Sequence, residues 1–128
     1  MDKEVVNWLS SARYDLETAE FMFSSGRFIY TIFMCHLALE KILKARIQQI
    51  TSQSPSKTHD LGYLSDLAGI APSPEVGKFL VEISNLGVIT RYPQDFSSLL
   101  KDFHKERSAI FLGKTKEVFA WIEKSLQS

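Results

Sequence analysis

Apolar residues recur every three or four positions through most of this chain, which is the spacing of an amphipathic α-helix. In the first such segment they are Val5, Leu9, Ala12, Leu16, Ala19 and Phe23, with charged residues between them. We predict a helix of about six turns here, ending at Ser24-Ser25-Gly26. A second helix is predicted over residues 27–49, and its first half is apolar on nearly all sides. We therefore expect the second helix to be the central, most buried element.

The second half of that helix is amphipathic. Its expected inward residues are Ile42, Leu43, Ile47 and Ile50, and its expected outward residues are Lys41, Lys44 and Arg46. A polar loop over residues 51–57 follows, and Thr58 is placed to cap a short helix through Leu67. Ser73-Pro74-Glu75 is typical of a helix start, and we expect this fourth helix to end at Gly87.

The last long helix is predicted from about Leu99 or His104 to Leu126. Its expected inward face comprises Leu100, Phe103, Ile110, Phe111, Val118, Trp121 and Ile122. No alternating strand pattern of useful length interrupts these segments, although residues 87–90 could be briefly extended. Long helices with short connections are usually antiparallel neighbours. The sequence therefore predicts one all-α domain over residues 1–128, an antiparallel up-and-down bundle of four to five helices.

Charge and cysteine content limit the possible functions. The chain has 15 Lys and Arg against 15 Asp and Glu, so any site for a polyanion must be local. Cys35 is the only cysteine and lies in an apolar run, which predicts a small buried residue rather than a disulfide. The three histidines lack the spacing of a metal site, and we predict neither a metal nor a cofactor. The apolar run over residues 28–39 is too short to span a bilayer, and no apolar signal region follows the N-terminus, so we expect a soluble, cytoplasmic protein without membrane contact.

Arg91-Tyr92-Pro93 is the first candidate for a binding site. Proline disfavours helical geometry in the preceding residue, so we expect a rigid, non-helical segment in which Tyr92 is extended. Arg91 would then grip a phosphate while Tyr92 stacks on a base or sugar. In the structural alternative, Arg91 pairs with a helix carboxylate and Tyr92 packs against the end of the bundle.

His59 is the second candidate, at the start of the short third helix. A histidine there could act as a general acid or base near neutral pH. It could equally order the start of the helix through a hydrogen bond. Glu40 and Lys44, four residues apart, are interpreted as an ordinary surface ion pair. His36 is interpreted as a satisfied histidine in the core.

Taken together, these landmarks resemble the HEPN family (higher eukaryotes and prokaryotes nucleotide-binding). The matching stretches are Trp8 to Ala19, Gly26, Cys35 to Ala45, Thr58-His59-Asp60-Leu61, Arg91-Tyr92-Pro93 and Trp121-Ile122. The resemblance covers almost the whole chain and implies a helical bundle that commonly forms a homodimer. It also implies a minimal nucleotidyltransferase partner in a toxin–antitoxin-like pair. Arg91, Tyr92 and Pro93, with His59, are the positions that it marks for ligand binding.

Many members of this family are ribonucleases with an Arg followed, after four to six residues, by a His. No arginine of this chain is followed by a histidine at that distance. The next histidine after Arg91 is His104, which lies too far along the chain. Our leading hypothesis is therefore a non-catalytic protein that binds a nucleotide or RNA. The second is a metal-independent ribonuclease with a rearranged site, in which His59 is the base and Arg91 stabilises the phosphate. The third is a pure protein-interaction module.

Overall fold

The protein consists of helices and connecting loops, with no strand among residues 1–126, which are the residues that the computed structural model describes. The all-α fold is thus confirmed. Gln127 and Ser128, the end of the expected domain, lie outside the described residues. The helices are α1 (Lys3–Ser24), α2 (Phe28–Thr51), α3 (Leu61–Leu67), α4 (Pro74–Arg91), α5 (Phe96–Asp102) and α6 (Lys105–Lys124).

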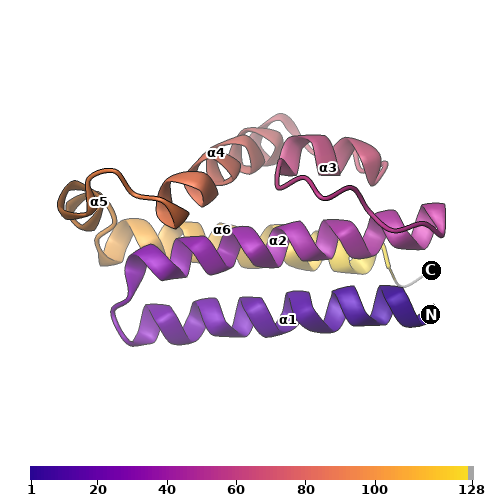
Figure 1. The fold of residues 1–128 in the computed structure, drawn as a ribbon, viewed down its shortest axis with the longest axis horizontal. Helices are drawn as coiled ribbons and strands as arrows, with labels where there is room; N and C mark the ends of the chain where they lie inside the picture. Colours follow the sequence, from indigo (N-terminus) through magenta and orange to yellow (C-terminus); the bar gives the residue numbers. More distant parts are fainter. Residues whose placement is uncertain (127–128) are drawn as a thin grey trace.

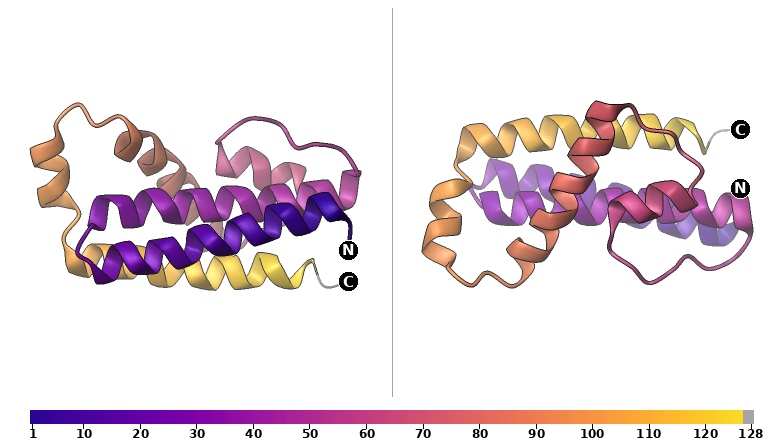
Figure 2. Two further views of the ribbon diagram at one scale, coloured as in Figure 1. Left: turned by 60° about the horizontal axis from the view of Figure 1, so that its bottom comes forward. Right: turned by 90° about the horizontal axis from the view of Figure 1, so that it is seen from above.

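The three long helices α1, α2 and α6 lie side by side, and α3 and α4 cover the opposite face of α2 (Figure 1). α1 and α2 are antiparallel because a short turn joins them, with Gly26 in the left-handed region at φ 76°. α4 runs obliquely across α2, and α5 leads back to the start of α6 (Figure 2). α2 therefore contacts every other helix, as expected of the central element.

Most of the helices are capped at their N-terminus by a polar side chain that accepts a hydrogen bond from a free backbone N–H group. Asp2 caps α1, Ser73 caps α4 and Asp95 caps α5. The cap of α3 is Asp60, which accepts from the Tyr63 N–H, so the predicted cap at Thr58 is wrong. An aspartate directly before the first apolar residue of the helix provides the better-placed acceptor.

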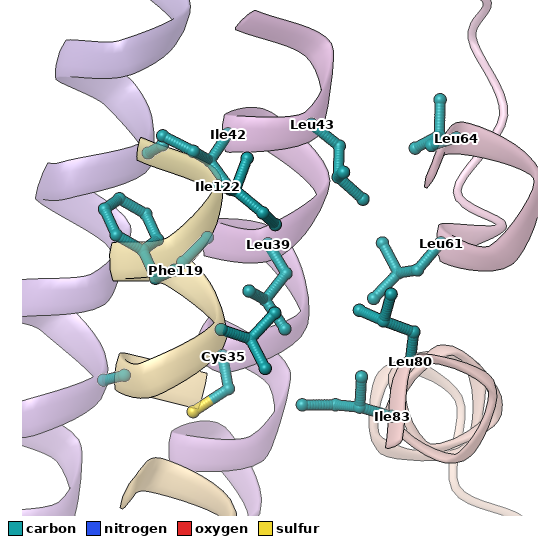
Figure 3. Close-up of a cluster of buried hydrophobic side chains, with 14 of the residues drawn as sticks. Cys35, Leu39, Ile42, Leu43, Leu61, Leu64, Leu80, Ile83, Phe119 and Ile122 are labelled. Atoms are coloured by element: carbon teal, nitrogen blue, oxygen red, sulfur yellow. The ribbon is translucent and has the colours of Figure 1, made fainter. Parts of the chain in front are cut away.

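Aliphatic side chains from α2, α3, α4 and α6 meet in one core (Figure 3). Leu39 and Leu43 of α2 lie opposite Leu61 of α3, and Ile122 of α6 lies on their other side. All four side chains are essentially inaccessible to solvent. Burying each contributes about 1.5–3 kcal/mol. Cys35 belongs to the same core, and burial raises the pKa of its thiol to about 11, which fits the predicted role of a small hydrophobic residue.

The fourth helix is longer than predicted. α4 continues through Gly87 to Arg91, so Gly87 does not end it and Arg91 belongs to its last turn. Tyr92, at φ −132° and ψ 68°, is the first residue outside the helix, and Pro93 follows it in the loop. A glycine inside a helix costs about 1 kcal/mol. Here that cost is offset by packing, because Gly87 is buried against α2 where a side chain would not fit.

The last predicted helix is two helices. α5 ends before Phe103, and the side chain of His104 caps the start of α6. The predicted alternative start at His104 is therefore confirmed. Four predicted inward side chains are instead exposed. They are Ile50, Leu100, Ile110 and Trp121. Each lies at the margin of a wide apolar stripe, and the sequence does not show which margin the neighbouring helix covers.

The apolar run at the start of α2 does not extend into a membrane-spanning helix. In the part of the chain that the structure describes, no helix combines the length and apolar character needed to cross a bilayer.

Candidate functional site

Three ionisable side chains of α2 lie in a row along the helix, from His36 beside Gly87 of α4 to Lys44 beside Trp8 of α1. They are His36, Glu40 and Lys44, spaced one turn apart, and each is more than nine-tenths buried. Buried charges are stable only when paired and hydrogen-bonded. The interpretation of Glu40 and Lys44 as a surface pair is therefore wrong, and so is the outward position of Lys44. Nevertheless, the two groups do interact, with 3.1 Å between Lys44 Nζ and Glu40 Oε2.

Glu40 also connects α2 to the loop before α3. Its other carboxylate oxygen, Oε1, accepts a hydrogen bond from Nδ1 of His59 at 2.9 Å. Because Nδ1 must carry the hydrogen of this bond, Nε2 of neutral His59 is left as an acceptor. The His59 side chain is 53% exposed, so this nitrogen is available to a ligand. A carboxylate that orients a histidine in this way is a common arrangement in general-base sites.

His36 of α2 also holds the loop before α3 in place. Its Nε2 donates to the backbone carbonyl of His59 at 3.1 Å, and its Nδ1 is buried without a hydrogen-bond partner. Burial is the main cause that lowers the pKa of His36, and the positive charge of Arg91 adds to the effect. Its imidazole lies against Gly87 of α4, where an added Cβ would come within 2.6 Å of the ring. The predicted satisfied core histidine is thus only half satisfied.

A pocket of about 380 Å³ lies beside His59, between the start of α3 and α4. Its lining consists of His59, Asp60, Val81, Ser84, Asn85 and Val88. These side chains provide hydrogen-bond donors and acceptors beside two valines of α4, but no lysine or arginine. The pocket is therefore suited to a base or sugar rather than to a phosphate.

The structure separates Arg91 from Tyr92 and Pro93. The guanidinium of Arg91 faces α2 and lies 5.2 Å from the centre of the Phe33 ring, in a cation–π contact. Tyr92 is 76% exposed, and with Pro93 it lines a different pocket, between α4 and α5. Arg91 does not line the pocket of His59, although both residues lie close to His36. In a single chain, the sequence-predicted residues are thus distributed over neighbouring surfaces along α4.

The comparisons with known proteins agree with this architecture. The family model of the HEPN domain matches residues 5–125. The chain belongs to the HEPN family. Two solved structures with this fold are ST0689, an archaeal HEPN homologue, at 17% identity and a TM-score of 0.77, and TT1696 from Thermus thermophilus, at 18% identity and a TM-score of 0.76. The matches cover 99% of this chain and 100% of ST0689, and 96% of this chain and 98% of TT1696. A search of curated proteins found no match.

In this HEPN domain, sequence reasoning missed Glu40 as a member of the site. A signal for it was present, because Glu40 follows His36 by one turn on the helix that was predicted to be the central, most buried element. An acidic residue on such a helix needs partners, and Glu40 has two, the buried Lys44 and the partly exposed His59. Among residues 1–126, no group of three or more His, Cys, Asp or Glu side chains is placed to hold a metal ion.

Proposed function

We propose that this HEPN domain binds a nucleotide or an RNA end without cleaving it, on the α2–α4 surface that carries His59 and Arg91. The observation that supports this proposal most is the fixed His59 side chain beside a polar pocket. Asn85, Ser84 and His59 would hydrogen-bond a base or sugar there. Arg91, whose guanidinium is part of the same α2–α4 junction, would attract the phosphate.

Titration of the purified protein with ATP and with a short RNA tests this proposal. Losing a hydrogen bond to a charged group costs about 1.5–3 kcal/mol, so Arg91→Ala should weaken binding by about tenfold or more. His59→Ala should weaken it as well. Arg13→Ala is the matched control, because Arg13 pairs with Glu123 on the opposite side of the bundle. Absent binding by the wild type, or equal binding by all four proteins, would overturn the proposal.

The ribonuclease hypothesis keeps one supporting observation, the hydrogen bond from His59 to Glu40. In that mechanism, Nε2 of His59 accepts the proton of an attacking 2′-hydroxyl group, and Arg91 stabilises the charge on the phosphate. Because Arg91 and His59 do not line one pocket within a chain, a second copy would have to complete the site. RNA decay that is lost in His59→Ala and in Glu40→Gln would favour cleavage. Decay that persists in both variants would exclude this mechanism.

We further propose that the domain forms a homodimer and acts with a minimal nucleotidyltransferase in a toxin–antitoxin-like pair. Membership of the HEPN family supports this partnership. Co-expression with a nucleotidyltransferase encoded beside this chain, followed by purification through one tag, provides the test. A stable complex that changes the transferase activity supports the pair, whereas separate elution of two active proteins contradicts it.

A further inference from the structure

A second groove lies at the end of α4, next to the pocket of His59 but not lined by His59. It is formed by the last turn of α4, the loop over residues 93–95 and the outer side of α5, and its volume is about 470 Å³. We call it the α4–α5 groove. The residues that line it are Val88, Ile89, Tyr92, Pro93, Gln94, Asp95, Ser98, Leu99 and Asp102.

The walls of the α4–α5 groove are apolar and accessible. Val88 is 63% exposed, Ile89 46% and Tyr92 76%, and the nearly buried Leu99 contributes a further apolar side chain. Phe96 and Leu100, on the same short helix as Leu99, are also half exposed. A contiguous apolar surface with an accessible tyrosine is typical of protein–protein contacts, because its burial removes apolar area from water.

The charges of the groove are all negative. Asp95 and Asp102 line it, and no lysine or arginine does. Hydrogen bonds from Ser98 lower the pKa of Asp95, so this carboxylate is ionised at neutral pH. Arg107 donates to the backbone carbonyl of Asp102, and in the described part of the chain neither carboxylate forms an ion pair. A phosphate here would face two negative charges, whereas a lysine or arginine would be attracted.

We propose that the α4–α5 groove docks a partner protein through a segment that carries a lysine or arginine next to an apolar anchor. The anchor packs against Val88, Ile89 and Leu99, and the basic group reaches Asp102 and Asp95. Arg91 faces α2 and does not line this groove, and the docking site shares only Val88 with the lining of the pocket beside His59. Failure of nucleotide binding would therefore leave the docking proposal intact.

Selection of a random peptide display library against the folded protein tests the proposal without a known partner. The recovered peptides should share a lysine or arginine beside a large apolar residue. Asp102→Lys should weaken their binding by about tenfold or more, because it replaces attraction with repulsion, and high salt should weaken it in the wild type. Ile89→Ser should weaken binding through lost apolar contact. Glu117→Lys, an exposed charge reversal on α6, is the control and should have no effect.

Amide chemical shifts measured with one selected peptide then locate the contact. Perturbations centred on Ile89, Leu99 and Asp102 support the proposal. Recovered peptides without basic residues, unchanged binding by Asp102→Lys, or perturbations on another surface would overturn it. Self-association through this groove, detected as a wild-type dimer that Ile89→Ser dissociates, would also overturn it, because the occupant would then be a second copy.

Discussion

At Gly87, α4 packs closely against α2. The imidazole of His36 occupies the space where a Cβ would lie, at 2.6 Å from its carbons. Gly87→Ala should therefore destabilise the fold by about 1–3 kcal/mol, since either the ring or the helix must move. Urea unfolding followed by circular dichroism measures this change.

Gly113 provides the matched control for that substitution. It lies within α6, and a Cβ added there would have no heavy atom within 4 Å. Gly113→Ala should thus stabilise the protein by up to about 1 kcal/mol through helix propensity alone. If both alanine variants had the same effect on the free energy of unfolding, close packing of Gly87 against His36 would be ruled out.

His36 should make stability depend on pH. Burial lowers its pKa below 6.5, whereas the hydrogen bond to the His59 carbonyl and the charge of Glu40 oppose this effect, and the positive charges of Arg91 and His59 add to it. As the pH falls below about 6.5, the unfolded chain takes up a proton that the folded protein does not, so stability falls by at most about 1.4 kcal/mol per pH unit. Comparing urea unfolding at pH 7.5 and 5.5 in wild type and His36→Gln isolates this contribution. An unchanged pH dependence in the variant would contradict it.

At the scale of the elements, the stability of the packing around α2 depends on the pairing of its buried charges. Glu40→Met leaves Lys44 buried without its carboxylate and should cost about 3–5 kcal/mol. The double variant with Lys44→Met should be more stable than either single variant, because the unpaired charge is gone and methionine fills a similar volume. A double-mutant cycle of unfolding free energies checks this expectation, and strictly additive effects would refute it.

The helices themselves were largely predictable from local pattern. Their inward stripes, the capping Ser73 and the turn at Gly26 depend on residues close in sequence, so α1, α2 and the start of α4 were predicted correctly. The end of α4 was not, because the tolerance for Gly87 comes from His36, which is 51 positions earlier on another helix. Helix propensity depends only on residues close in sequence, so it cannot reveal a contact between two helices.

At the scale of the whole molecule, the central position of α2 predicts a gradient of local stability. α2 contacts every other helix, whereas α5 is short and packs only lightly, mainly through Leu99. Amides of α2 should exchange with deuterium only on global unfolding, and those of α5 through local opening at much lower free energy. Native-state hydrogen exchange measures both. Equal protection of α5 and α2 would contradict this picture.

The candidate residues show the same division between local and long-range information. Residue types and order pointed to His59, Arg91 and Tyr92 as polar landmarks, and to the HEPN family, to which the chain belongs. How these residues are grouped depended on the tertiary packing around α2. The crossing of α4 over α2 aims Arg91 at Phe33 and places Tyr92 in the α4–α5 groove, and the loop before α3 brings His59 to Glu40.

The sequence by itself determined the all-α class, the extents of α1 and α2 and the family, because hydrophobic period, caps and turns act over a few residues. Only the tertiary structure decided that Glu40 and Lys44 are buried, that α4 passes through Gly87, and that Arg91 and Tyr92 face different surfaces. The physical reason is that a charge or a glycine inside a helix is unfavourable locally. A partner from a distant part of the chain must offset that cost, and the fold alone brings the partner within reach.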